Sequence, residues 1–305
     1  MQIRAFLPTS SRGRVAVVFS VNCNYICVSP PRIVFGGGEM VYNQLVTLMK
    51  KFLCLLFVPL MVLVVSCKKD EQNNNDKIPV PEAIDLGITV DGKNVKWASF
   101  NIGASKPWEY GNYYAWGECE PKEVYSWKTY AYSNANGYLT KYCPKDDTSY
   151  WDMTAKPEGP DGITTLYPSD DVAHVKLGGK WRMPTKDEID ALLALKENAD
   201  YTWEPWVYAT DENGNEAKDS KGNVIYGLRI TRISNSSVLF LPAAGYREDA
   251  NLVKAGAYGG YLSNSLYSTS ANPKFPRLLE FYSNPHDDIA SLRKYGSPVR
   301  PVYVE

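Results

Sequence analysis

The sequence predicts an α+β fold that is rich in loops, with short, mostly antiparallel strands and a few helices. Beyond Ala83, short apolar runs alternate rapidly with clusters of Gly, Asn, Asp, Pro and Ser, the residues that favour turns. No second linker interrupts this pattern, so we expect one domain over residues 83–305. The expected strands are Val95–Ile102, Tyr113–Trp116, Trp181–Met183, Tyr226–Ile233, Val238–Pro242, Tyr261–Leu266, Leu278–Tyr282 and Val299–Val304.

One helix is predicted by its start signal as well as by its apolar face. Thr185 is followed three residues later by Glu188, which is the spacing of a capping box, in which the two side chains bond the free backbone N–H groups of the first turn. Ile189, Leu192 and Leu193 then fall at i, i+3 and i+4 and give the helix one apolar stripe. We expect a helix that starts near Thr185 and packs on the core.

Residues 49–66 have the features of a secretory signal. Two lysines precede an uncharged apolar run that is shorter than the ~20 residues a membrane-spanning helix needs. The run ends in VVSC, which resembles the lipobox of bacterial lipoproteins and implies cleavage before Cys67 and acylation of its sulfur; the alternative is a buried helix with an incidental cysteine. Residues 1–48 are interpreted as upstream sequence translated from a misassigned start, or at most as a segment removed with the signal.

Residues 67–82 are expected to be the acylated cysteine and a disordered tether. The segment is polar and Asn-rich, and it contains too little apolar surface to fold alone. The pair Asp70-Glu71 resembles the surface-export signals of some Gram-negative lipoproteins. We therefore expect a protein of the cell envelope, anchored to the outer membrane by its lipid, with surface exposure as one possibility.

Charge and cysteine content restrict the partners and the redox chemistry. The formal net charge is −1, which provides no general attraction to nucleic acid, so we expect no nucleic-acid partner. Two cysteines remain in the expected domain, Cys119 and Cys143. In an exported protein they are a possible disulfide, and the alternative is two unpaired buried thiols.

Aromatic residues supply the candidate binding surface. All eight tryptophans follow the expected signal, and tyrosine (22) far outnumbers phenylalanine (9). Most of these rings are expected to fill the core, because a domain with few regular elements needs large side chains between its loops. The tyrosines of a Gly-, Asn- and Ser-rich stretch are better candidates for ligand contact. The candidate ligand-binding residues are Tyr246, Arg247, Tyr258, Tyr261, Asn264 and Tyr267.

A series of motifs, in order along the chain, resembles a known family. They are DLG (85–87), VKWASFNIGAS (95–105), EYGNYYAWGE (109–118), LTKYC (139–143), SDDVAHVKLGGKWRMPT (169–185), LFLPAAGYR (239–247) and SPVRPV (297–302). Together they look like the Fibrobacter succinogenes major paralogous domain of bacterial lipoproteins. The resemblance implies a C-type lectin-like fold in which the first and last strands pair. WRMPTKDEI is also similar to a signature of the formylglycine-generating and sulfatase-modifying group.

Two insertions and one substitution depart from that pattern. DGKN (91–94) interrupts the usual run and suggests a hairpin extension. The segment ATDENGNEAKDSKGNV (209–224) looks like a hairpin excursion or surface insertion, and its acidic spacing misses the calcium-loop pattern of an EF-hand. Family members often carry a cysteine where this chain has Tyr132-Ser133, so a bridge between Cys119 and Cys143 is not the usual family arrangement.

The sequence favours binding over catalysis. Copper-thiolate chemistry of the formylglycine-generating type needs a late cysteine pair, and no cysteine follows Cys143. GxSxG, HExxH and phosphate-loop motifs are absent, as are the EPN and WND triplets of calcium-dependent lectins. We therefore expect no catalytic residue, no metal and no cofactor.

Three functional hypotheses remain in order of preference. The first is a surface-anchored, non-catalytic module that binds a glycan or a protein through loops between Gly245 and Lys294, as in adhesion. The second is a passive structural or assembly component of the envelope. The third is a divergent enzyme that uses His174 with Asp171; the other histidine, His286, lies in an acidic loop.

Overall fold

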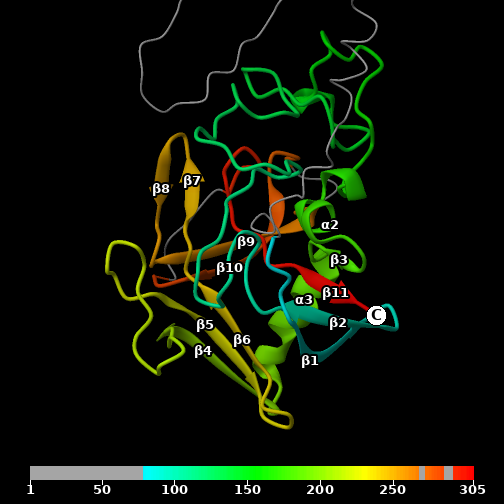
Figure 1. The fold of residues 1–305 in the computed structure, drawn as a ribbon. Coiled ribbons are helices and arrows are strands. Elements are labelled where there is room, and N and C mark those ends of the chain that lie inside the picture. The colour runs from blue at the N-terminus through cyan, green and yellow to red at the C-terminus, as the bar shows by residue number, and fades with distance from the viewer. Residues whose placement is uncertain (1–77, 268–271, 285–290) are drawn as a thin grey trace, which may run out of the picture. The chain divides into compact units, whose positions relative to one another are not determined.

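The computed structural model describes residues 78–267, 272–284 and 291–305, and all of them fall in one compact unit, residues 73–305. The expected signal peptide, the acylated Cys67 and most of the tether lie outside the described residues. Among the residues that are described, no helix has the length and apolar character needed to cross a membrane. Figure 1 shows short strands, short helices and long connecting loops. The loop-rich α+β class predicted from the sequence is confirmed.

The first sheet joins the two ends of the domain. Its order is β1-β2-β11-β3, and its neighbouring strands pair antiparallel. Asp91 and Gly92 connect β1 to β2 with φ angles of 50° and 74°, the backbone of a tight hairpin turn, so the hairpin expected at DGKN is present. Val302 of β11 lies opposite Trp97 of β2, so the first and last of the strands expected from the sequence pair with each other, although β1, which was not expected, precedes β2. The strands are β1 (Ala83–Val90), β2 (Lys93–Ala98), β3 (Trp181–Arg182) and β11 (Val302–Val304).

The remaining strands form three small antiparallel sheets. One has the order β4-β5-β6, and the other two are the pairs β9-β10 and β7-β8. In Figure 1 the β7-β8 hairpin projects beyond the β4-β5-β6 sheet. The bounds are β4 (Tyr201–Tyr208), β5 (Tyr226–Arg232), β6 (Val238–Pro242), β7 (Tyr246–Glu248), β8 (Asn251–Val253), β9 (Tyr258–Leu266) and β10 (Pro276–Tyr282).

The described residues form two α-helices, α2 (Val172–Leu177) and α3 (Lys186–Ala194), and three short 3₁₀ turns, η1 (Thr148–Tyr150), η2 (Pro168–Asp170) and η3 (Leu195–Glu197). The capping box at the start of α3 is confirmed, because Thr185 and Glu188 bond each other's backbone N–H groups. The buried Glu188 carboxylate also accepts a bond of 2.7 Å from Arg182. It therefore ties α3 to β3.

The largest apolar cluster lies between the β1-β2 hairpin, α3, β5, β6 and the β9-β10 pair. Burying this surface is the main favourable contribution to folding, at roughly 25 cal/mol per Å². The stripe predicted on α3 contributes two of its buried residues, Ile189 and Leu192. The cluster consists of Leu86, Ile88, Val95, Trp97, Ile189, Leu192, Leu228, Ile230, Leu239, Leu241, Tyr261, Leu279 and Val302.

Some strand predictions were wrong. Tyr113–Trp116 is not a strand, because its only ladder contact is an isolated bridge from Tyr114 to Ser297. β1, β4, β7 and β8 were not predicted at all. β4 contains Pro205 and a bulge at Trp206, where φ is 61°, so its sequence does not read as a strand.

The two cysteines of the domain are free thiols. Cys143 is buried and its sulfur lies 3.3 Å from the carbonyl oxygen of Asp147, whereas the sulfur of Cys119 lies 3.7 Å from that of Ser169. The possible disulfide is therefore not formed, and the alternative of two unpaired thiols holds. Each thiol is held by its own loop, and burial raises the pKa of Cys119 to about 11 and that of Cys143 to about 12.

Two arginines are completely buried without a carboxylate partner. Arg300 donates to the side-chain oxygen of Asn101 (2.7 Å) and to the carbonyl oxygens of Ala98 (2.9 Å) and Phe240 (3.0 Å). Its guanidinium therefore joins the end of β2 to β6. Arg293 stacks over Trp116 at 4.7 Å and bonds two loop carbonyls. Burial lowers the pKa of Arg300 to about 10, which leaves it charged at neutral pH.

Replacing Arg300 with methionine should destabilise the domain strongly. The change removes the donors of three buried neutral oxygens, and each buried acceptor left unsatisfied costs about 1–3 kcal/mol, so the total loss should be about 3 kcal/mol or more. Urea unfolding measures this loss. The matched control is Arg229→Met, because Arg229 is partly exposed and lies 3.8 Å from Glu204 in a surface pair; it should cost less than about 1 kcal/mol. Equal losses in the two variants would contradict the role given to Arg300.

Alkylation should show that the two thiols of the domain are unpaired. Denatured protein that has never been reduced is expected to take up one alkyl group at Cys119 and one at Cys143, as read by peptide mass. In the native protein both should react slowly, because only thiolates react readily and their pKa values are raised; buried Cys143 should be the slower. A peptide pair linked through sulfur would show instead that the bridge forms.

Candidate functional site

The insertion predicted at residues 209–224 folds as two successive hairpin turns of the same kind. Each has the sequence D-x-x-G-N, at residues 211–215 and 219–223. In each turn the aspartate carboxylate accepts the backbone N–H groups two and four residues ahead, at 2.8 to 2.9 Å. The glycines, Gly214 and Gly222, have φ of 80° and 84°, a region that L side chains rarely adopt. Local turn chemistry thus shapes the insertion.

A closed ring of backbone hydrogen bonds holds the base of the insertion. Ala217 donates to Ala209 (2.9 Å), Ile225 donates to Ala217 (2.9 Å), and Ala209 donates to Ile225 (2.8 Å). These three residues recur every eight positions, and their buried side chains form an apolar cluster with Phe240 of β6. The insertion is therefore fixed to the β4-β5-β6 sheet by a small core of its own.

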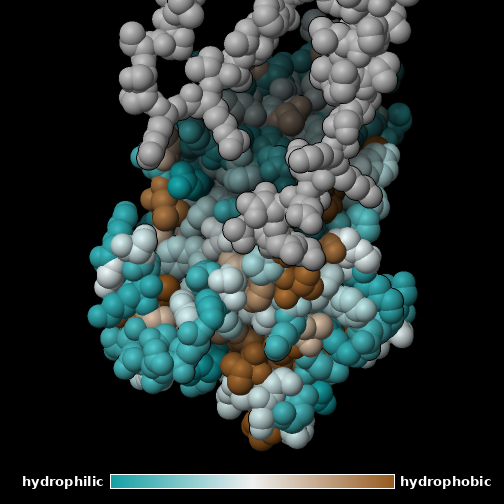
Figure 2. All heavy atoms as spheres, in the orientation of Figure 1, coloured by the Kyte–Doolittle hydropathy of each residue, from teal (hydrophilic) through white to brown (hydrophobic). Residues whose placement is uncertain are grey.

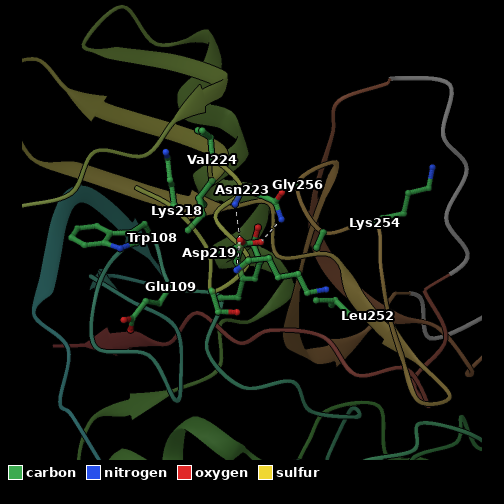
Figure 3. A pocket seen from close by; sticks show the side chains of 14 residues that line it. Trp108, Glu109, Lys218, Asp219, Asn223, Val224, Leu252, Lys254 and Gly256 are labelled. Atoms are coloured by element: carbon green, nitrogen blue, oxygen red, sulfur yellow. Dashed lines mark hydrogen bonds between the residues drawn. The ribbon is translucent and has the colours of Figure 1, made fainter. Parts of the chain in front are cut away.

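A cavity of about 640 Å³ lies where the second turn meets two other loops. Such a volume suits a small-molecule ligand. Its walls are the segment 108–110, residues 218–225 at the second turn of the insertion, and Leu252 of β8 with the turn 254–256 that follows it. Figure 3 shows Trp108 and Glu109 on one side of this pocket, Leu252 on the other, and Asp219 between them. We refer to it as the Trp108 pocket.

Side-chain hydrogen bonds position the Trp108 segment. One carboxylate oxygen of Glu109 accepts the backbone N–H groups of Ser105 (2.7 Å) and Lys106 (3.2 Å) and so closes a turn around Trp108. The amide of Asn101 donates to the carbonyl of Tyr110 (2.9 Å), and Asn101 is itself held by Arg300. The aromatic side of the pocket is therefore fixed to the buried guanidinium.

The carboxylates of the pocket already accept hydrogen bonds, whereas two of its lysines have no ion-pair partner among the described residues. Asp219 accepts from Lys221 and Asn223, and the Asn223 side chain is the main reason that its pKa lies below the ordinary value. Within the described residues, neither Lys218 nor Lys221 forms an ion pair. Both are exposed. Figure 2 shows hydrophilic side chains over the region where Figure 1 draws the insertion.

Three of the residues predicted to bind ligand are buried, which corrects that prediction. Tyr258 and Tyr261 are 0% exposed and Asn264 is 8% exposed. All three belong to β9, which is buried along nearly its whole length. The Tyr261 hydroxyl donates to Pro242 (2.6 Å) and that of Tyr258 to Glu280 (2.7 Å). These side chains are parts of the core with satisfied polar ends.

The other three predicted residues stay accessible, but none of them lines the Trp108 pocket. Tyr246 is half-buried and packs edge-on against Tyr258 at 5.9 Å. Arg247 is half-buried and lies over the ring of Tyr113 at 5.6 Å. Tyr267 is 57% exposed. The structure does not bring the six candidates together into one site.

Asp171, the aspartate that the enzyme hypothesis pairs with His174, has a structural role. The Asp171 carboxylate caps α2 by accepting the backbone N–H groups of Ala173 and His174 at 3.0 Å, and it also accepts that of Met183. The hydrogen bond between His174 and Asp171 is thus donated by the backbone N–H of His174. His286 lies outside the described residues. Among those that are described, no group of three or more His, Cys, Asp or Glu side chains could hold a metal.

Sequence reasoning did not single out Trp108 as a pocket residue; its ring is partly buried and packs against the Ala209, Ala217, Ile225 and Phe240 cluster while also lining the pocket. A usable signal was present, because Trp108 follows a proline in a polar loop rather than an apolar run. The twin D-x-x-G-N turns were a second signal. The expected ligand face between Gly245 and Lys294 supplies one wall of the pocket, which consists of Leu252 of β8 and the turn 254–256.

Comparisons with known proteins assign neither a family nor a function to this chain. Searches against protein-family models, curated proteins and solved structures find no match. The resemblance to the paralogous-domain family therefore rests on the motifs alone. The chemistry of the Trp108 pocket carries the functional argument.

Replacing Asp219 with alanine should loosen the second turn without unfolding the domain. The backbone N–H groups of Lys221 and Asn223 lose their acceptor, so their amide hydrogens should exchange faster. Hydrogen-exchange mass spectrometry or NMR measures this. Asp211→Ala is the matched control, because it should speed exchange only in the first turn, at Asn213 and Asn215. Unchanged exchange at 221 and 223 would show that the carboxylate does not hold the turn.

Proposed function

We propose that this chain is a non-catalytic binding module of the bacterial cell envelope that holds a saccharide in the Trp108 pocket. The observation that carries the proposal is the pairing of an aromatic side chain with polar turn residues around a cavity of about 640 Å³. Sugars present an apolar face and a rim of hydroxyl groups, so a ring and nearby hydrogen-bonding groups suit both surfaces.

A saccharide fits this site better than a protein does. A protein interface is broad, with about 800 Å² buried on each partner, and its central contacts are large apolar and aromatic side chains. The Trp108 pocket is instead concave and local, and the insertion that forms one wall is polar along its outer edge. Its size matches one or two sugar rings more closely than a protein surface.

The fold assignment belongs to the same proposal. We propose that the domain is a C-type lectin-like member of the paralogous-domain family and that Cys67 carries a lipid which anchors it to the outer membrane. The pairing of β2 with β11 and the capped α3 after WRMPT support the first part. The basic, apolar and VVSC segments in residues 49–67 support the second.

Replacing Trp108 with alanine should weaken saccharide binding about tenfold or more, because loss of a central aromatic contact commonly costs more than about 1.4 kcal/mol. A glycan array identifies the ligand, and calorimetry compares the variants. Tyr267→Ala is the control, since it removes an exposed ring outside the pocket and should leave binding unchanged. Absence of binding to any saccharide, with the protein folded, would contradict the proposal and favour a passive structural role.

A further inference from the structure

One tyrosine of the Trp108 pocket differs from the buried tyrosines of the domain in how its hydroxyl is used. Tyr113 and Tyr261, for example, each donate to a loop carbonyl at 2.6 Å. Tyr110 is half-buried and lines the pocket, and among the described residues its hydroxyl has no hydrogen-bond partner. Polar groups away from bulk water are normally hydrogen-bonded, so this hydroxyl has capacity left for a bound molecule.

The position of Tyr110 is fixed before any ligand arrives. The side-chain amide of Asn101 donates to the Tyr110 carbonyl (2.9 Å), and Arg300 holds Asn101 in turn (2.7 Å). The Tyr110 ring packs against two apolar clusters, one of which is the small core beneath the insertion. A ligand would therefore meet a hydroxyl whose ring is already ordered, which reduces the entropy cost of binding.

The hydroxyl of Tyr110 keeps its proton at neutral pH. Burial raises the pKa of Tyr110, and the negative charge of Asp219, which lines the same pocket, raises that pKa further. A protonated phenol donates one hydrogen bond and also accepts, as a sugar hydroxyl does. Tyr110 can therefore pair with a sugar hydroxyl in either direction.

Other neutral groups of the pocket are uncommitted in the same way. Within the part of the chain that the structure describes, neither the indole N–H of Trp108 nor the hydroxyl of Ser220 forms a hydrogen bond, and both residues line the cavity. Lysines and carboxylates both line it as well, so charge does not single out a ligand. Discrimination falls to the neutral donors and acceptors.

We infer that Tyr110 is a specificity-determining residue of the Trp108 pocket, whose hydroxyl bonds one hydroxyl group of a saccharide that packs on Trp108. The pocket then distinguishes saccharides that differ at this one hydroxyl. The inference rests on the proposed function and adds to it the residue that reads the ligand and the kind of group that is read.

The test uses the full-length protein in detergent and titrates it, by NMR, with the methyl glycosides of glucose, galactose and mannose and with their monodeoxy analogues. For a glycoside that binds, the analogue lacking the hydroxyl that meets Tyr110 should bind roughly two- to tenfold more weakly, the usual effect of one neutral hydrogen bond.

The key variant is Tyr110→Phe, which keeps the ring and removes the hydroxyl. It should bind the parent glycoside and that one deoxy analogue equally, while the effects of the other deoxy positions stay as in the wild-type protein. Its thermal unfolding should match the wild type, because no internal hydrogen bond is lost. Tyr138→Phe is the matched control, since it removes an exposed phenol outside the pocket; it should discriminate as the wild type does.

The outcomes separate this inference from the proposed function. Wild-type discrimination at every hydroxyl in Tyr110→Phe would overturn the role of Tyr110 and keep the saccharide module. An equal loss for the parent and all of its analogues would also overturn it, because Tyr110 would then only support the pocket. Failure of the wild-type protein to bind all three glycosides would overturn the inference, and failure to bind any glycan on the array as well would overturn the proposed function.

Discussion

The buried guanidinium of Arg300 is the interaction on which the arrangement of this domain most depends. A buried charge without a carboxylate partner is costly unless hydrogen bonds to the charged group compensate for the lost solvation. Arg300 meets that condition by bonding Asn101 and the carbonyls of Ala98 and Phe240. Because these groups come from β2, the loop after it and β6, their relative positions are fixed together.

Tyrosine hydroxyls perform the same task for the loops. Regular elements are few, so many loop carbonyls need donors that no strand supplies. Tyr113 donates to Ala244, Tyr130 to Trp116 and Tyr261 to Pro242, each from a buried ring. A phenylalanine would fill the same space and leave the carbonyl unpaired. This explains why tyrosine is abundant here, and why tyrosines of β9 that seemed suited to ligand contact lie in the core.

Local signals in the sequence were sufficient for some elements and not for others. The α3 cap, the turn at Asp91-Gly92 and β6 follow from short-range chemistry, and they were predicted correctly. β1 and β4 were missed, because their pairing partners and a bulge at Trp206 decide them rather than their own alternation. The pocket was missed for a related reason: its walls come from three segments far apart in the chain, and only the fold places Trp108 beside Asp219.

In the insertion, exposed polar residues determine the chemistry of the pocket, whereas a few buried apolar residues attach it to the domain. The insertion closes on itself through the Ala209, Ala217 and Ile225 ring and contacts the sheet through a small apolar cluster. Its exposed positions, such as Lys218 and Lys221, contribute little buried area. Substitutions there change the charge offered to a ligand at little cost to folding, because surface changes usually alter stability by less than about 0.5 kcal/mol. Trp108 differs, since its segment is tied through Asn101 to Arg300, so the aromatic side of the pocket is the part that the core holds in place.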